Sequence, residues 1–310
     1  MNKPLWQPSI KKREESLLME FSKFVELKPS SFNELWEWSI DNPKIFWSKF
    51  WDFSKMIGDK GEEIIRFDKI FNKTRFFPDA KINYAENILK KKTEETAIGF
   101  LSESGYKEKI TWNELYLKVC KLSWYFKSLN IKAGDRIAGY VPNKIESVIS
   151  FLACAKNGII WSSCSPDFGI QGVVDRFKQI EPKVLITCDY YFYNGKKIDI
   201  LKNLEEIIKK IPSIKETLVF SYKKEKSIKV DKFKDFNKIL STSKLDENFK
   251  RFEFNHPIYI LYSSGTTGKP KCITHGTGNV LIEHNKEFIL HCDVRNNEKL
   301  FYYTTTGWMM

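Results

Sequence analysis

The sequence lacks the features that mark several classes of protein. Its six cysteines include no C-x-x-C pair, and with only four histidines they show no spacing typical of a metal site. No segment approaches 18 consecutive apolar residues, and the polar N-terminus has no apolar run of the kind found in a secretory signal. We find no internal repeat and no low-complexity tract. We therefore expect reduced structural thiols, no metal held by the protein alone, no membrane partner and a cytoplasmic location.

Basic residues outnumber acidic residues, and the formal net charge is +12. The lysines are spread along the chain, with local clusters only at residues 11–13, 90–92 and 223–226. A nucleic-acid-binding protein would gather this charge on one face. We therefore expect no nucleic-acid partner, and a solvated surface that weakly attracts anionic ligands. The 42% hydrophobic and 15% aromatic content indicates a folded chain of one large or two medium domains.

The N-terminal region is rich in aromatic residues at helical spacing. Ser31 with Glu34 forms a capping-box pattern, and Pro43 suits the first turn of a second helix. We expect these aromatic side chains to pack as ordinary core. The resulting domain prediction is an N-terminal extension (1–30), a small helical module (31–91) and a main domain (92–310).

Strand and helix patterns alternate through the main domain. The expected strands are 96–101, 136–141, 159–161, 184–188 and 217–220. The expected helices are 82–89, 111–129, 145–155, 171–180 and 201–211. Such alternation predicts parallel βαβ units in a layered α/β domain with parallel or mixed sheets. The lysine-rich stretch 223–250 is expected to form surface hairpins and loops.

A glycine-rich loop near the C-terminal end is the most informative motif. An apolar run, 258–262, leads into the small residues of 263–268, then into Lys269, Pro270 and Lys271. Helical spacing resumes over 276–291, which predicts a strand, a turn, basic residues and a helix. Glycines let backbone N–H groups approach an anion, and hydroxyls and a lysine add donors. The alternative is a flexible linker, but a linker needs no preceding strand and no Pro-Lys pair.

The loop string Ser-Ser-Gly-Thr-Thr-Gly-Lys-Pro-Lys resembles the phosphate-binding loop of the adenylate-forming superfamily of acyl-CoA synthetases and luciferases. It differs from the common P-loop, because only two residues separate its glycines. Residues 32–53 and 82–89 resemble the N-terminal module, and the helix that follows it, of the acetyl-CoA and acetoacetyl-CoA synthetases. Residues 165–169, 175–185 and 303–310 are similar to the acetoacetyl-CoA synthetase group rather than the acetyl-CoA group.

The resemblance implies a two-step reaction with ATP, acetoacetate and CoA, assisted by Mg²⁺, in lipid and ketone-body metabolism. Thr267 and Lys271 are the implied catalytic residues. The implied phosphate-binding residues are Ser263, Ser264, Gly265, Thr266, Thr267, Gly268, Lys269 and Lys271. For Lys269, a solvated loop charge is an equal alternative. His275 either shapes the site or caps the next strand.

The resemblance also assigns the acyl and CoA ends of the site. Trp308, Met309 and Met310 match the acyl-pocket wall of the group, with ordinary core as the alternative. Tyr193 and Lys196 belong to a turn that resembles the place where relatives contact CoA phosphates. Relatives with acetyl substrates have glycines at the positions of Ser162 and Ser163. Whether these two residues contact CoA is therefore left open.

The adenine- and ribose-binding motifs, the hinge and the C-terminal catalytic lysine of the superfamily are absent from these 310 residues. We therefore expect the first half of such an enzyme, an incomplete large N-terminal domain preceded by the helical module, without adenylation turnover of its own. Two alternatives remain: a synthetase for acetate or another short-chain acid, and a non-catalytic nucleotide-binding product. The oligomeric state is left open.

Overall fold

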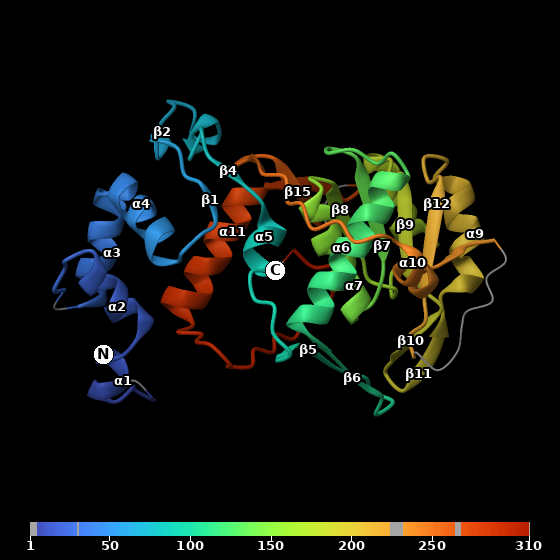
Figure 1. The fold of residues 1–310 in the computed structure, drawn as a ribbon, viewed down its shortest axis with the longest axis horizontal. Helices are drawn as coiled ribbons and strands as arrows, with labels where there is room; N and C mark the ends of the chain where they lie inside the picture. The colour runs from blue at the N-terminus through green and yellow to red at the C-terminus, as the bar shows by residue number, and fades with distance from the viewer. Residues whose placement is uncertain (1–4, 30, 224–231, 264–267, 310) are drawn as a thin grey trace. The chain divides into compact units, whose positions relative to one another are not determined.

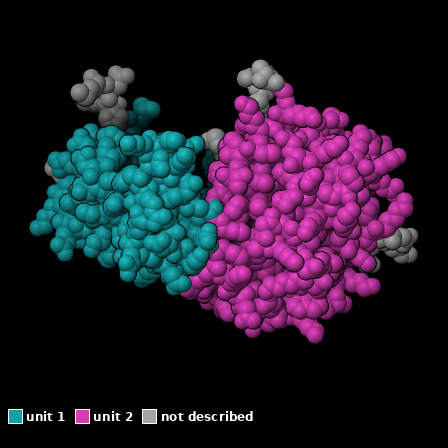
Figure 2. Space-filling view, turned by 90° about the horizontal axis from the view of Figure 1, so that it is seen from above, with its two compact units in different colours: residues 1–82, 253–255, 278–302 teal, residues 83–252, 256–277, 303–310 magenta. Residues whose placement is uncertain are grey.

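The structure of the chain, a computed structural model, describes residues 5–29, 31–223, 232–263 and 268–309. By spatial contact the chain divides into two compact units (Figure 2). The first unit comprises Met1–Ile82, Glu253–Asn255 and Gly278–Tyr302. The second comprises Asn83–Phe252, His256–Thr277 and Tyr303–Met310. The predicted domain boundaries at residues 30 and 91 were drawn from sequence resemblance, whereas these units are defined by spatial contact. The predicted boundaries therefore stay a prediction.

Serine caps start the helices of the first unit. The side chains of Ser9, Ser16 and Ser31 each accept a hydrogen bond from a backbone N–H of the turn that follows. Pro43 opens the fourth helix at a position where its missing N–H is tolerated. The N-terminal helices of this unit are α1 (Ile10–Glu14), α2 (Leu17–Phe24), α3 (Phe32–Asp41) and α4 (Pro43–Phe53).

Aromatic side chains form the core of the first unit. The Phe21 ring of α2 meets the rings of Phe46, Phe50 and Phe53 in α4 edge-on, with centroids 5.6, 5.9 and 5.2 Å away. Phe21 and Phe50 are fully buried. The prediction that the aromatic cluster is core packing is confirmed for these residues.

Later segments of the chain complete the first unit. The rings of Trp51, Phe77 and Phe254 lie 5.0 to 6.2 Å apart, so the segment Glu253–Asn255, from the last fifth of the sequence, packs with the N-terminal helices. Asp293 accepts a hydrogen bond of 2.8 Å from the backbone N–H of Leu17 at the start of α2. Other elements are β1 (Gly58–Asp59), β2 (Ile65–Arg66), a 3₁₀ turn (Phe71–Lys73), β3 (Arg75–Phe76), β4 (Lys81–Ile82), β14 (Phe252–Glu253), α11 (Thr277–Lys286) and a π-helical turn (Glu287–His291).

A seven-stranded sheet organises the second unit (Figure 1). Its strands are β7 (Arg136–Tyr140), β8 (Ile160–Cys164), β9 (Val184–Cys188), β12 (Glu216–Phe220), β13 (Lys234–Asp235), β15 (Pro257–Ser263) and β16 (Lys271–Gly276). They run in the order β13-β12-β9-β7-β8-β15-β16, and only β15 and β16 pair antiparallel. The predicted layered α/β fold with a mixed sheet is confirmed.

Helices cover both faces of this sheet. The chain crosses from β7 to β8 through α7 (Ile145–Lys156), then returns past β7 to β9 through α8 (Ile170–Ile180). Because such crossovers are right-handed, α7 and α8 lie on opposite faces. In agreement, α6 (Trp112–Ser128) packs on α7 (Figure 1). On the other face, α8 packs on α9 (Leu201–Lys210). Thr111 and Glu114 form a capping box at the start of α6.

Two local predictions for the second unit are wrong. The stretch 223–250 contains a helix, α10 (Phe236–Thr242), because Asp235 caps it and its apolar side chains are buried. After the glycine-rich loop the chain forms β16 before α11 begins, so the loop joins two strands rather than a strand and a helix.

Smaller elements complete the second unit. These are α5 (Tyr84–Ile88), the hairpin of β5 (Thr96–Leu101) and β6 (Lys107–Thr111), and the hairpin of β10 (Tyr190–Tyr193) and β11 (Lys196–Asp199). All six cysteines are free thiols, and four of them are buried, which agrees with the structural role expected. Among the described helices, none combines the length and the apolar content that crossing a bilayer requires.

Candidate functional site

The glycine-rich loop connects β15 to β16 as the tip of a hairpin. The register pairs Ser263 with Lys271 across the two strands. Ser263 is half-buried, whereas Gly268, Lys269 and Lys271 are exposed. An anion at the loop would therefore meet the ammonium groups of two solvated lysines. The predicted phosphate-binding residues Ser264, Gly265, Thr266 and Thr267 lie outside the described residues.

Neighbouring elements hold both ends of this loop. Ser162 Oγ on β8 donates to the Ile260 carbonyl at 2.8 Å and lies 3.1 Å from the Tyr262 hydroxyl. Burial raises the pKa of Tyr262, so its phenol stays neutral. On the other side, Gln179 Nε2 of α8 donates to the Pro270 carbonyl at 2.9 Å. Contacts from β8 and α8 thus hold the strand that leads into the loop and the backbone just before β16.

His275 lies within β16, where its ring centroid is 5.0 Å from that of Tyr259. Burial lowers the pKa of the imidazole, which therefore stays neutral at pH 7. Its Nε2 is buried and has no hydrogen-bond partner among the described residues. His275 therefore packs against Tyr259 of the neighbouring strand, and its role at the site stays a prediction.

A cavity of about 290 Å³ opens beyond the carboxyl ends of β7 and β8. Tyr140, Asp167, Phe168 and Tyr193 are among the residues that line it. The Tyr140 hydroxyl lies 2.9 Å from the carbonyl oxygens of both Pro166 and Phe168, which fixes the segment after β8. In open α/β sheets, ligands bind beyond the carboxyl ends of the strands. The position of the cavity is therefore that of a ligand site.

The β10–β11 hairpin places the predicted CoA contacts beside this cavity. Asn194 and Gly195 at its turn have φ values of +50° and +72°, and their N–H groups donate to the Glu103 carboxylate at 3.0 and 2.9 Å. Tyr193 lines the cavity and is 54% exposed. Lys196 is exposed at the turn, whereas the ammonium of Lys197 lies 3.9 Å from the centroid of the Tyr190 ring.

The predicted acyl-wall residues follow an extended segment at the same edge of the sheet. Trp308 is 64% exposed and Met309 is half-buried, while Met310 lies outside the described residues. Neither Trp308 nor Met309 lines the 290 Å³ cavity. Their ring and thioether groups are thus separate from the cavity that Tyr193 lines.

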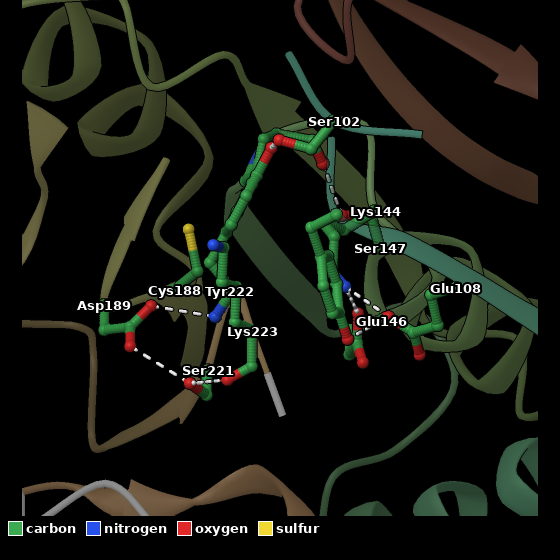
Figure 3. Close-up of polar contacts among 12 residues, drawn as sticks. Ser102, Glu108, Lys144, Glu146, Ser147, Cys188, Asp189, Ser221, Tyr222 and Lys223 are labelled. Atoms are coloured by element: carbon green, nitrogen blue, oxygen red, sulfur yellow. Dashed lines mark hydrogen bonds and ion pairs between the residues drawn. The ribbon is translucent and has the colours of Figure 1, made fainter. Parts of the chain in front are cut away.

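Sequence reasoning missed a buried ionic group at these strand ends (Figure 3). The ammonium of Lys144, just before α7, lies 2.5 Å from a Glu108 carboxylate oxygen and 3.6 Å from one of Glu146. The Lys144 side chain is completely buried, and its ammonium lies 4.6 Å from the Phe100 ring and 5.7 Å from the Tyr222 ring. We call these five residues the Lys144 cluster. No motif in the sequence marks it.

A second carboxylate ties the ends of β9 and β12 together (Figure 3). Asp189 accepts hydrogen bonds of 2.8 Å from the backbone N–H groups of Tyr190 and Tyr222, and its other oxygen lies 3.2 Å from Ser221 Oγ. Burial raises the pKa of Asp189 against the opposing effect of these hydrogen bonds. The arrangement holds the carboxyl ends of two neighbouring strands together.

Comparison with known proteins finds relatives that are named as CoA synthetases. The chain is 39% identical over 319 residues to acetoacetyl-coenzyme A synthetase of Rhizobium meliloti, covering 99% of the chain and 48% of that protein. It matches the structure of acetoacetyl-CoA synthetase from Streptomyces lividans with a TM-score of 0.92 and 32% identity, over 99% of the chain and 48% of that structure. It is also 33% identical to a malonamoyl-CoA synthetase of Penicillium aethiopicum, covering 99% of the chain and 45% of that protein.

The chain spans about half the length of the relatives that it matches. The sequence model described as "AMP-binding enzyme" matches residues 85–310, which include the sheet, the loop and the cavity. The likeness therefore covers most of the chain, and the elements that hold the candidate site fall within it. The chain belongs to the AMP-binding enzyme family.

Proposed function

We propose that this chain forms part of an acetoacetate–CoA ligase that acts in the cytoplasm, and that the complete reaction belongs to the full-length gene product. In the first step a carboxylate oxygen of acetoacetate attacks the α-phosphorus of ATP, and the bond to pyrophosphate breaks. In the second step the CoA thiol loses its proton and attacks the acyl carbon, and AMP leaves. The products are acetoacetyl-CoA, AMP and pyrophosphate.

The hairpin loop is the observation that supports this proposal. Hydrogen bonds hold the Ile260 carbonyl in the strand before the loop and the Pro270 carbonyl next to β16, while Lys269 and Lys271 are exposed. Donors that face a leaving group stabilise the charge that develops on it. Thr267 and Lys271 would hold the pyrophosphate end of ATP, and Mg²⁺ bound to the nucleotide would share the neutralisation of charge.

The CoA end of the proposed site lies at the β10–β11 hairpin. Lys196 is exposed at its turn, and Tyr193 borders the 290 Å³ cavity. We assign Lys196 to the CoA phosphates, because a solvated ammonium binds phosphate as a mobile point charge. Trp308, Met309 and Met310 would border the acyl group.

Another carboxylic acid is the second candidate substrate. A relative that is named for malonamoyl-CoA is 33% identical to this chain, which is close to the 34–39% of the relatives named for acetoacetyl-CoA. The residues that select the acid can therefore differ within this range of identity. A nucleotide-binding product without turnover is the candidate from another class.

The test measures pyrophosphate release by the full-length gene product with acetoacetate, acetate and malonamate as separate substrates. Acetoacetate should give the highest kcat/KM. Lys271→Ala should lower kcat by about 10²-fold or more, since removal of one preorganised donor has an effect of that order. Lys196→Ala should raise the KM for CoA and leave pyrophosphate release in the absence of CoA unchanged.

Lys209→Ala, which alters an exposed lysine of α9, is the matched control for lost surface charge and should change neither rate. ATP binding without pyrophosphate release from any acid would instead support the non-catalytic candidate. A higher kcat/KM with another acid would change the substrate assignment, and full activity of Lys271→Ala would refute the role of the loop.

A further inference from the structure

The segment 303–309 is held against the ends of β7 and β8 by three side chains. Thr306 Oγ1 donates to the Val141 carbonyl, and Asn143 Nδ2 donates to the Thr304 carbonyl, each at 2.6 Å. Ser163 Oγ donates to the Thr306 carbonyl, also at 2.6 Å. Val141 and Ser163 are buried, so water competes little for the two bonds that involve Thr306, whereas the bond from Asn143 is exposed. The segment has no strand or helix of its own over these residues.

We propose that Asn143, Ser163 and Thr306 are positioning residues that fix the backbone of 304–308 and thereby set the preference for the acid substrate. We call these three residues the clamp. The inference rests on the proposed function, in which Trp308 and Met309 border the acyl group. The clamp residues act through the backbone of the segment that carries Trp308 and Met309.

The clamp leaves the segment little freedom to move. Two of its bonds end on carbonyls on either side of Thr305, and the third starts from the Thr306 side chain. At Gly307, an added Cβ would lie 2.9 Å from Phe168 Cε2 and 3.1 Å from the Ser165 backbone nitrogen. The segment therefore packs closely on the residues after β8 as well as being hydrogen-bonded to them.

This packing also connects the acyl segment to the neighbouring cavity. Phe168 lines the 290 Å³ cavity, and the Arg176 guanidinium lies 4.1 Å from the centroid of its ring. A displacement of the segment would thus move a wall shared with the site assigned to CoA. Reacting groups misplaced by about 1 Å can lose about 10²-fold in rate, so a fixed backbone matters for a small acid. Positions held by strand ends are also more precise than positions on loops alone.

The matched pair Thr306→Val and Thr187→Val tests the clamp in the full-length gene product. Thr187 Oγ1 donates to the Tyr140 carbonyl at 2.8 Å and is buried, so both variants remove a hydroxyl bound to neighbouring carbonyls at the end of β7. Only Thr306 belongs to the acyl segment. Thr306→Ser keeps the hydroxyl and serves as the rescue variant.

Thr306→Val should lower the ratio of kcat/KM for acetoacetate to that for acetate about fivefold, the factor expected for one lost hydrogen bond. The KM for ATP should change less than about twofold, because the phosphate loop keeps its own anchors. Thr306→Ser should restore the ratio, and Thr187→Val should leave it unchanged. Hydrogen exchange of the amides of 304–308 should be faster in Thr306→Val and Ser163→Ala, and unaltered in Thr187→Val.

The remaining outcomes contradict either the clamp or the proposed function. Faster exchange with an unmoved acid ratio would show that the three bonds serve stability alone, and unaltered exchange would show that they do not hold the segment. Either result overturns the clamp while leaving the ligase assignment intact. A wild-type protein that releases no pyrophosphate with any acid would refute the proposed function, and with it the selection of the acid.

Discussion

Lys144 and Lys271 lie in the same compact unit, but their ammonium groups have opposite surroundings. Lys144 is completely buried between Glu108 and Glu146 and faces aromatic rings. Lys271 is exposed where β16 leaves the glycine-rich loop. A buried charge must be paired to be stable, whereas an exposed charge is solvated and can exchange water for a ligand.

The comparison shows that surroundings, not residue type, separate a structural lysine from a ligand-binding one. The Lys144 cluster ties β5, β6 and the start of α7 to the end of β12 (Figure 3). The charge of Lys144 is neutralised by carboxylates within the protein, so Lys144 would attract a phosphate only weakly. The charge of Lys271 is not committed in this way, which is why the proposed function assigns it to the nucleotide.

The largest effect on stability is expected from Lys144→Met. The variant keeps the length of the side chain but leaves the carboxylates of Glu108 and Glu146 buried without their ammonium partner. Breaking a buried pair in this way costs about 3–5 kcal/mol. Urea unfolding followed by circular dichroism should show a correspondingly lower midpoint.

The double variant Lys144→Met/Glu108→Gln identifies the cause of this loss. If the unpaired charge is responsible, neutralising Glu108 should recover part of the stability that Lys144→Met loses. A double variant that is less stable than Lys144→Met would instead attribute the loss to packing around the aromatic rings, and the contrast with Lys271 would lose its electrostatic basis.

A smaller effect is expected from Asp189→Asn, and it should depend on pH. Burial raises the pKa of Asp189 in the folded chain above its unfolded value of about 3.9. The folded state therefore binds the proton more tightly, and its advantage, complete below that value, is lost as pH rises through the folded pKa. The asparagine variant has no such titration.

The measurement is the unfolding free energy of the wild-type protein minus that of Asp189→Asn between pH 3 and pH 8. This difference should fall as pH rises above about 4, because only the wild type loses the contribution of the carboxyl group. Taking the difference cancels the titration of other groups. A difference that is constant or that rises with pH would contradict the assignment of a raised pKa.

Much of the fold follows from local signals in the sequence. The capping box of Thr111 and Glu114 and the serine cap at Ser31 lie where the pattern predicts them, because both interactions involve residues three apart. β16 was missed because its residues 271–274 are exposed and show no alternation of apolar side chains. α10 was missed because seven residues are too few for a clear helical period.

The candidate site was predictable only where a motif marks it. The glycine-rich string locates the loop, and likeness to relatives locates the acyl segment and the CoA turn. The clamp and the Lys144 cluster leave no such mark, because their partners are brought together by the fold. Asn143 and Thr304 are 161 positions apart, and Ser163 and Thr306 are 143 apart. Only the sheet, which places the ends of β7 and β8 side by side, reveals these contacts.

The smallest effect on stability is expected from Lys271→Met, which makes the same substitution as Lys144→Met at the exposed site. The free energy of unfolding should change by no more than about 0.5 kcal/mol, since surface substitutions rarely do more. The same variant should nevertheless lose pyrophosphate release in the full-length gene product. A stability loss comparable to that of Lys144→Met would mean that Lys271 has a partner in the complete protein. Its effect on catalysis could then be indirect, whereas an unchanged midpoint with lost turnover separates ligand binding from folding.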